Sequence, residues 1–308
     1  MTPIPFTKMA GTGNDFLIVD ARPHTKPGSS GRSRGFGVGA WSAVSRSMCD
    51  RHRGVGADGL LVLGPSRRAD VRMRIFNPDG SEAEMCGNGA RCVAGYEVRQ
   101  QATGNRQQAG LERRATIETK AGLLSATVRG NRVAMRMTAP TQLAPGLTVK
   151  VDGRPVSLGF INTGVPHAVV PVNRLDEVDV PGLGRALRRH RQFAPAGANV
   201  DFIEPHPTRP NRVRVRTYER GVEGETLACG TGVVASAILY GLNRPGSGSN
   251  GVPRTHRIEV EARSGDLLTV SFTTGHNGRR LMAANVVLEG AVAHICEGSY
   301  DWSTRRRQ

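Results

Sequence analysis

A duplication is the feature of this sequence that most limits how the chain can fold. The stretch VRMRIFNPDGSEAEMCGNG begins at Val71, and VRVRTYERGVEGETLACGTG begins at Val213. Both open with apolar residues that alternate with arginine, which is typical of a half-exposed strand. Both then reach a glycine-containing turn and a cysteine, Cys86 after 15 residues and Cys229 after 16. The pattern indicates two copies of one supersecondary unit.

Weaker repeats lie upstream of each copy. GTGNDFLIVD (11–20) parallels NTGVPHAVVP (162–171), and GADGLLVL (56–63) parallels GANVDFIE (197–204). A chance similarity of one pair is plausible, but the repeated features occur in the same order in both halves. Duplication of a whole half-chain is therefore the better interpretation, and two similar domains are expected.

Each half is expected to be strand-rich, with one apolar helix after its cysteine. GARCVAGYEVRQQ and GVVASAILYGLNR have the composition of such helices. VRGNRVAMRM and RIEVEARSGDLLTVSF predict hairpins with turns at Gly130-Asn131 and Ser264-Gly265. The glycine-rich stretches 22–41 and 243–256 predict loops. The boundary is placed near 138–146, which gives domains 1–138 and 139–308, with the last strand available to pair with the first half.

Each of the two cysteines directly precedes a glycine at a predicted strand-to-helix junction. The first turn of a helix carries backbone N–H groups without partners and a partial positive charge. Such a junction is expected to lower the pKa of Cys86 and of Cys229 from about 8.5 toward neutrality. It also offers a cradle for an anion such as a carboxylate, to which Asn88 and Thr231 can add side-chain donors.

Two matched thiols suit one class of reaction. Inverting a stereocentre needs a base on one face of the carbon and an acid on the opposite face, and the reverse direction exchanges these roles. One thiolate and one thiol fulfil both requirements. A substrate carboxylate bound at the helix N-termini would stabilise the enolate-like charge of the transition state. We therefore expect Cys86 and Cys229 to be catalytic.

Cysteines also occur in proteins for reasons unrelated to catalysis. A buried cysteine is usually a small packing residue, which is the expectation for Cys92 and Cys296. The spacing of Cys86 and Cys92 is not that of zinc ligands, so no metal site is expected. A disulfide between Cys86 and Cys229 would be an oxidised, inactive form. A redox sensor built on these two thiols would instead respond to that disulfide.

The net charge of +16 first suggests a nucleic-acid-binding protein. Only four of the 42 basic residues are lysine, however, and the arginines are spread along the chain without a recognisable nucleic-acid-binding motif. Nucleic-acid binding is therefore not expected. The sequence shows no signal peptide or long apolar run, and its odd count of five cysteines favours reduced thiols, so a soluble cytoplasmic protein is expected.

Together the motifs resemble one enzyme family. GTGNDF, RGVGADG, FNPDGSEAEMCGNGARC, GVPH, GANVDFIE and YERGVEGETLACGTG occur in the order found in diaminopimelate epimerases. The resemblance implies an α/β fold of two pseudo-symmetric domains, each a curved sheet or barrel wrapped around a central helix, with the active site in the cleft between them. It implies interconversion of LL- and meso-2,6-diaminopimelate, for lysine and peptidoglycan precursors, without pyridoxal phosphate or metal. It also implies a homodimer.

The same resemblance assigns roles to individual residues. Cys86 and Cys229 match the catalytic pair. Glu219 and Arg220 match a pair that contacts the distal end of the substrate, where Arg220 can bind a carboxylate and Glu219 an ammonium. The other matches are asparagines that hold the substrate, backbone cradles for its carboxylates and a nearby histidine: Asn14, Asn77, Asn199, Gly87, Asn88, Gly230, Thr231 and His167.

Two positions depart from the family pattern. Val165 stands where many members carry asparagine before the Pro-His pair, a contact that Asn162 could supply, and Gly59 stands where many carry glutamine. A racemase for another amino acid, such as proline or histidine, is the alternative within the same reaction class. The Glu219-Arg220 pair argues against such a monocarboxylic substrate.

Overall fold

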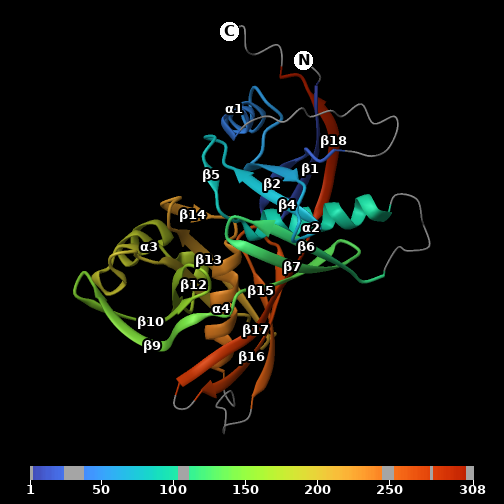
Figure 1. Cartoon of the computed structure of the whole chain (residues 1–308). Coiled ribbons are helices and arrows are strands. Elements are labelled where there is room, and N and C mark those ends of the chain that lie inside the picture. The colour runs from blue at the N-terminus through green and yellow to red at the C-terminus, as the bar shows by residue number, and fades with distance from the viewer. Residues whose placement is uncertain (1–2, 24–37, 103–110, 245–252, 278–279, 303–308) are drawn as a thin grey trace. The chain divides into compact units, whose positions relative to one another are not determined.

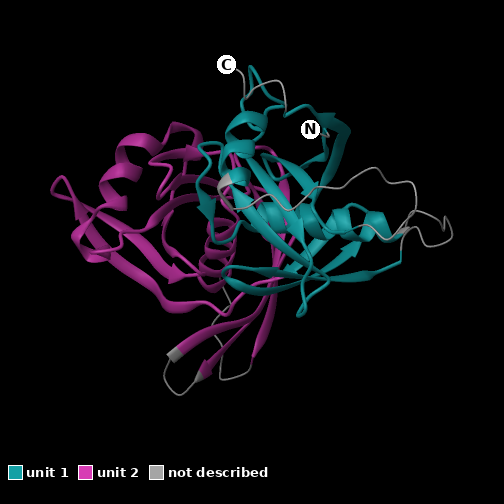
Figure 2. Cartoon of the chain, turned by 45° about the horizontal axis from the view of Figure 1, so that its top comes forward, with its two compact units in different colours: residues 1–135, 291–308 teal, residues 136–290 magenta. Residues whose placement is uncertain are grey.

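The computed structural model describes residues 3–23, 38–102, 111–244, 253–277 and 280–302 (Figure 1). The chain divides into two units (Figure 2). Unit 1 comprises residues 1–135 and 291–308, and unit 2 comprises residues 136–290. The C-terminal segment thus belongs to unit 1, where β18 (Ala293–Tyr300) pairs antiparallel with β1 (Ile4–Gly11).

Strand pairing in unit 1 forms one continuous ladder. Its order is β18, β1, β2 (Asn14–Asp20), β3 (Gly59–Gly64), β4 (Val71–Phe76), β6 (Arg113–Thr119), β7 (Gly122–Arg129) and β8 (Arg132–Arg136). The pairs β2–β3 and β4–β6 are parallel, and the other pairs in the ladder are antiparallel. The short β5 (Glu82–Ala83) pairs with β4 just before Cys86.

Unit 2 repeats this ladder step by step. Its order is β9 (Thr141–Val151), β10 (Arg154–Asn162), β11 (Pro166–Pro171), β12 (Asn199–Pro205), β13 (Arg212–Glu219), β15 (Arg254–Glu261), β16 (Leu267–Asn277) and β17 (Arg280–Ala291). Here β11–β12 and β13–β15 are the parallel pairs, and β14 (Gly224–Thr226) takes the place of β5. The matching order confirms the expected α/β fold and the duplication.

Two parallel neighbouring strands must be joined by a crossover connection. In each of the four parallel pairs, this connection contains a helix. In unit 1, α1 (Val38–Met48) joins β2 to β3 and α2 (Gly87–Ala102) joins β4 to β6. In unit 2, α3 (Val180–Arg188) and α4 (Gly230–Leu242) take the equivalent positions. The helices after the cysteines, α2 and α4, confirm the prediction, as do the hairpin turns after Arg129 and between β15 and β16.

The two glycine-rich stretches are not loops over their whole length. The loop prediction for 22–41 is wrong at its end, where α1 begins at Val38 because Trp41, Val44 and Met48 share one face that packs into the core of unit 1. Residues 24–37 lie outside the described residues. The second predicted loop ends early, since β15 begins at Arg254, and residues 245–252 of it are not described. Helix α3, capped by the side chain of Asp179, was not predicted.

Each cysteine-bearing helix runs along the core of its own unit. Helix α4 packs against β10, β11, β12, β13, β15 and β16, and α2 packs against β1, β2, β4, β6 and β7. Helix α4 is buried nearly all round, as expected of an apolar core helix. Helix α2 is more polar and buries Arg91 and Glu97. No helix in the described part of the chain is long and apolar enough to span a membrane.

Candidate active site

Both cysteines stand at the first turn of their helices. The carbonyl of Cys86 accepts the Ala90 N–H at 2.8 Å, and that of Cys229 accepts the Val233 N–H at 2.9 Å. The Cys86 Sγ accepts the Gly89 N–H at 3.5 Å, and the Cys229 Sγ lies 3.4 Å from the Thr231 hydroxyl. Each sulfur thus lies beside first-turn donors, as the sequence predicted. Each of the chain's five cysteines carries a thiol in the structure.

Equivalent ion pairs hold the strand that leads to each cysteine. Glu82 in β5 and Glu225 in β14 each stand four residues before a cysteine. An arginine of the neighbouring strand forms an ion pair with each carboxylate: Arg74 with Glu82 at 2.8 Å, and Arg216 with Glu225 at 2.7 Å. A second cation, Lys120 in unit 1 and Arg263 in unit 2, completes each cluster. These clusters fix the backbone just before both thiols in the same way.

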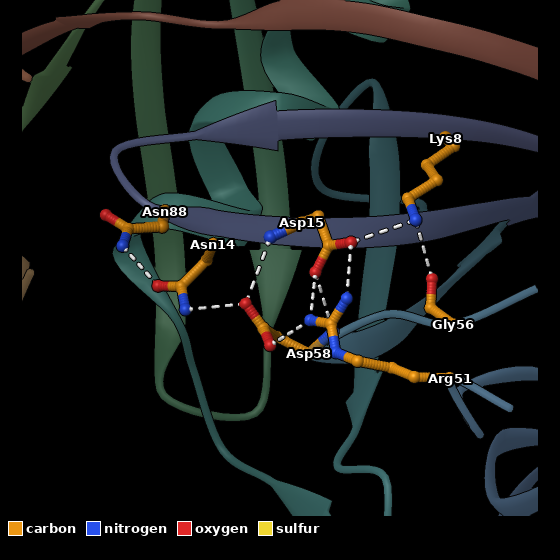
Figure 3. A network of polar contacts seen from close by, with 7 residues as sticks. All are labelled: Lys8, Asn14, Asp15, Arg51, Gly56, Asp58 and Asn88. Atoms are coloured by element: carbon orange, nitrogen blue, oxygen red, sulfur yellow. Dashed lines mark hydrogen bonds and ion pairs between the residues drawn. The ribbon is translucent and has the colours of Figure 1, made fainter. Parts of the chain in front are cut away.

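In unit 1, Asn14 and Asn88 are directly bonded (Figure 3). The Asn88 amide donates to the Asn14 Oδ1 at 2.7 Å, and Asn14 donates in turn to the Asp58 carboxylate at 3.0 Å. Asn88 is buried, and its Oδ1 accepts from the buried guanidinium of Arg91 at 2.8 Å. The predicted residues Asn14, Cys86, Gly87 and Asn88 therefore lie together at the start of α2.

Two cations and two carboxylates support this cluster. Arg51 bridges Asp15 at 2.8 Å and Asp58 at 2.7 Å, and Lys8 pairs with Asp15 at 2.9 Å (Figure 3). Lys8 also donates to the Gly56 carbonyl at 2.7 Å. Burial opposes ionisation of Asp15, but its bonds to Arg51 and Lys8 prevail and lower its pKa to about 2. The network sets the orientation of the Asn14 amide through Asp58.

The low pKa of Asp15 predicts a loss of stability in acid. An unfolded aspartate titrates near pH 3.9, so the contribution of Asp15 is present above about pH 4 and is lost as the pH falls toward about 2. As the pH is lowered between these values, the unfolding free energy of the wild type should decrease more steeply than that of Asp15→Asn. Urea unfolding at a series of pH values measures both slopes. Equal slopes would contradict the assignment, and Glu177→Gln, which removes an exposed ion pair with Arg174, serves as control.

Asn77 is placed differently from the other predicted asparagines of unit 1. Its side-chain amide donates to the Ser81 hydroxyl at 2.9 Å, and its backbone N–H donates to the Ser81 carbonyl at 2.8 Å. The Ser45 hydroxyl donates to its carbonyl at 2.8 Å. Asn77 thus closes the turn between β4 and β5, whereas Asn14 and Asn88 bond each other at the start of α2.

In unit 2, a fully buried polar cluster lies beneath the start of α4. The ring of His167 bonds the Asp201 carboxylate at 2.7 Å through Nδ1, and the Thr217 hydroxyl donates to the same carboxylate at 2.7 Å. The Asn199 amide lies 3.5 Å from the other ring nitrogen, and its Oδ1 accepts the Arg220 N–H at 2.7 Å. The predicted residues His167, Asn199 and Arg220 are therefore joined in one chain of hydrogen bonds.

Glu219 is the last residue of β13, and Arg220 follows it. Burial raises the pKa of the Glu219 carboxyl, and the nearby Asp201 carboxylate adds to the rise. The guanidinium of Arg220 donates to the Ala196 carbonyl at 3.2 Å. Within the described residues, neither Glu219 nor Arg220 takes part in an ion pair. The role of this pair in binding the distal end of a substrate stays a prediction.

The expected lowering of the cysteine pKa is wrong for Cys229. Burial raises the pKa of this thiol above its ordinary value, and the nearby carboxylates of Glu219 and Asp201 raise it further. Hydrogen bonds from Thr231 and Gly232 offset this only in part. The side chain is 8% exposed, so the cost of removing a charge from water exceeds the benefit of the helix terminus.

Comparison with known proteins tests the family resemblance. A model of the family described as diaminopimelate epimerase matches residues 6–143 and 159–289. The chain belongs to the diaminopimelate epimerase family. It is 40% identical over 297 residues to the diaminopimelate epimerase of Aquifex aeolicus, covering 95% of this chain and 96% of the relative. The diaminopimelate epimerase of Archaeoglobus fulgidus is 40% identical over 271 residues, covering 84% and 89%.

Solved structures share the fold of this epimerase family member at low identity. A phenazine biosynthesis protein of the PhzF family from Bacillus anthracis superposes with a TM-score of 0.68 at 20% identity, covering 98% of this chain and all of that one. A probable proline racemase from Agrobacterium radiobacter gives 0.65 at 16% identity, covering 98% and 94%. At such identities the similarity shows the fold alone. Membership in the epimerase family makes the chain an isomerase.

Val165, one of the two departures from the family pattern, lies in the turn between β10 and β11 of this epimerase. The Asn162 side chain accepts the Gly164 N–H at 3.0 Å and so closes the turn before Pro166, while the Val165 carbonyl accepts the Thr163 N–H. The Thr163 hydroxyl donates to the Thr231 carbonyl at 3.0 Å, which anchors the first turn of α4 to the turn after β10. The Asn162 side chain therefore stabilises the turn between β10 and β11.

The sequence did not predict the charged residues that hydrogen-bond to the candidate site residues and orient them. Asp201 supports His167, Asp58 supports Asn14, and Arg91 supports Asn88. Asp201 carried a usable signal, because a charged residue inside the otherwise apolar strand NVDFI must be buried and paired. Among the described residues, no group of three or more histidine, cysteine, aspartate or glutamate side chains is placed to hold a metal ion.

Proposed function

We propose that this protein interconverts LL- and meso-2,6-diaminopimelate with two thiols that act on opposite faces of one α-carbon. The observation that carries the proposal is the duplication of the cysteine junction. Cys86 and Cys229 stand at the first turns of α2 and α4, which hold equivalent places in two equivalent ladders. A reaction that inverts a stereocentre reversibly needs two such equivalent groups.

The proton transfers balance without a co-reactant. A thiolate takes the α-proton and becomes a thiol, and the electron pair of the broken C–H bond moves onto the α-carbon and into its carboxylate. The opposite thiol gives its proton to the other face of the carbon and becomes a thiolate. The configuration is inverted and the two sulfurs have exchanged their states. First-turn N–H groups beside Gly87 and Gly230 stabilise the negative charge on the carboxylate.

The polar residues support a substrate that carries both signs of charge at each end. Glu219 and Arg220 suit the distal ammonium and carboxylate, since neither pairs within the described part of the chain. The amides of Asn14, Asn88 and Asn199 supply neutral donors and acceptors whose orientation the protein sets. An acidic and a basic residue side by side argue against a monocarboxylic amino acid such as proline as the substrate.

Solvent exchange tests the proposal. The purified protein incubated with LL-diaminopimelate in D2O should incorporate deuterium at the α-carbon of the product, as followed by NMR and mass spectrometry. Proline and histidine should show no exchange under the same conditions. Deuterium exchange into proline or histidine, but not into diaminopimelate, would support the alternative racemase activity. The absence of exchange into all three amino acids would refute the two-thiol mechanism.

We further propose a cytoplasmic homodimer without a nucleic-acid partner. Some of the basic residues are engaged within the fold, since at least eight of the 38 arginines pair with carboxylates there: Arg22, Arg51, Arg74, Arg188, Arg212, Arg214, Arg216 and Arg263. Light scattering of the purified chain decides the oligomeric state. Retention of duplex DNA at physiological salt would contradict the second part.

A further inference from the structure

Helices α2 and α4 differ in a trio of buried side chains on the strands beneath them, which is apolar in unit 1 and polar in unit 2. The ladders align Phe16, Leu61 and Ile75 of unit 1 with His167, Asp201 and Thr217 of unit 2, because each trio occupies the same registers of three neighbouring strands. All six side chains are buried. The two copies therefore share the backbone arrangement but carry an apolar trio in unit 1 and a polar trio in unit 2.

The polar trio contains one buried carboxylate, that of Asp201. The amide of Asn199 is oriented by two backbone groups, since its Oδ1 accepts the Arg220 N–H and its Nδ2 donates to the Pro166 carbonyl at 3.2 Å. Its NH2 group therefore lies 3.5 Å from the Nε2 of His167. The Nδ1 of the same ring lies 2.7 Å from the Asp201 carboxylate, which is fully buried.

Gly232 connects this carboxylate to the sulfur. Its N–H hydrogen-bonds the Cys229 thiol, while its α-carbon packs so closely on Asp201 that an added Cβ would overlap the Oδ1. Glu219 is a second acid that faces the thiol from β13. The cation that follows β13, Arg220, directs its guanidinium to the Ala196 carbonyl.

The positions around Cys86 that correspond to Asp201 and Val234 carry different groups. Gly89, the counterpart of Gly232, packs on Leu61 in place of a carboxylate. Five residues after Cys86, α2 buries Arg91, where α4 has the apolar Val234. The polar network beside Asn14 is neutral overall, because its two carboxylates are matched by Lys8 and Arg51.

Several other charged groups in or near the two helices are paired. In unit 1 these include Asp20 and Glu97 with Arg22, and Glu82 with Arg74 and Lys120, while Glu118 accepts the Ser66 hydroxyl and the exposed Glu84 stands two residues before Cys86. In unit 2 they include Glu225 with Arg216 and Arg263, Glu259 with Arg212, Glu204 with Arg214, and His256 stacked on Phe272. Cys92, in the next turn of α2, is a buried thiol.

We propose that Asp201 keeps Cys229 protonated in the enzyme without substrate, so that Cys86 is the thiolate that begins catalysis. A thiolate at Cys229 would form close to the buried carboxylate of Asp201, whereas a thiolate at Cys86 would lie on a helix that carries a buried arginine. Both sulfurs share the benefit of a helix N-terminus, which therefore cannot distinguish them. Asp201 acts as a positioning residue that works through charge, and this inference rests on the proposed two-thiol function.

Alkylation of each thiol as a function of pH tests the inference without any substrate. Iodoacetamide reacts with the thiolate, and peptide mass spectrometry follows Cys86 and Cys229 separately. The plateau of each rate profile reports accessibility, and the midpoint reports ionisation. The Cys229 midpoint should lie at least about one pH unit above that of Cys86, a tenfold smaller thiolate fraction at neutral pH. A Cys229 midpoint at or below that of Cys86 would overturn the inference, even if solvent exchange succeeded.

Two variants separate charge from packing. Asp201→Asn keeps an acceptor for His167 and removes the charge, so it should lower the Cys229 midpoint by about one unit and leave that of Cys86 in place. Thr217→Val disturbs the same buried cluster but keeps the charge, and should not lower the Cys229 midpoint. A folded Asp201→Asn protein with an unchanged Cys229 midpoint would refute the role of Asp201. Should that variant not fold, the comparison of the two wild-type midpoints still decides which thiol ionises first.

Discussion

Alanine at either Cys86 or Cys229 is expected to lower kcat/KM for diaminopimelate epimerisation by about 10²- to 10⁴-fold, the range in which positioned acid–base groups contribute. In the proposed mechanism, each direction of the reaction uses one sulfur as base and the other as acid, so the loss of either thiol should stop both directions. The double variant should be little worse than either single one, because residues that act as a unit are not additive. Coupled assays of both substrate isomers measure the loss.

Cys296→Ala provides the matched control for these variants. This thiol is exposed on β18 and stands outside the proposed chemistry, so its removal should leave kcat/KM within about twofold. Thermal unfolding of all variants excludes loss of the fold as the cause of inactivity. Full turnover by Cys86→Ala or by Cys229→Ala would remove the two-thiol mechanism altogether.

The second large effect concerns one glycine in the first turn of α4. In Gly232→Ala, the added Cβ would overlap the Asp201 Oδ1 and lie 3.3 Å from the His167 Cε1. Asp201 cannot easily move away, because His167 and Thr217 both bond it in a fully buried place. Overpacking of this kind typically costs about 1–3 kcal/mol, which outweighs the gain of about 1 kcal/mol from alanine in a helix. Urea unfolding should show the loss.

The duplicated position in unit 1 offers a control of the same chemistry. In Gly89→Ala, the nearest atom to the new Cβ is the Leu61 Cδ2 at 3.1 Å, the flexible end of an apolar side chain. A small rotation relieves this contact, so the unfolding free energy should stay within about 1 kcal/mol of the wild type. A Gly89→Ala variant as unstable as Gly232→Ala would show that the pinned carboxylate is not the cause.

Local pattern was sufficient to predict much of this protein. The repeated strand, turn and cysteine predicted two equivalent units, and the apolar runs after Cys86 and Cys229 predicted α2 and α4. Helix α1 escaped prediction because its beginning continues a glycine-rich stretch. Its register depends on a face that only the unit 1 core reveals.

The sequence by itself determined the duplication, the two cysteine junctions and the family, since each follows from the spacing of neighbouring residues. Only the tertiary structure decided what lies beneath each junction. Leu61 and Asp201 occupy equivalent registers of β3 and β12, but the repeats GADGLLVL and GANVDFIE place them one residue out of step. The charge around a thiol depends on residues brought together from distant strands and on burial from water. For this reason, the sequence predicted two alike cysteines where the fold places them in unlike surroundings.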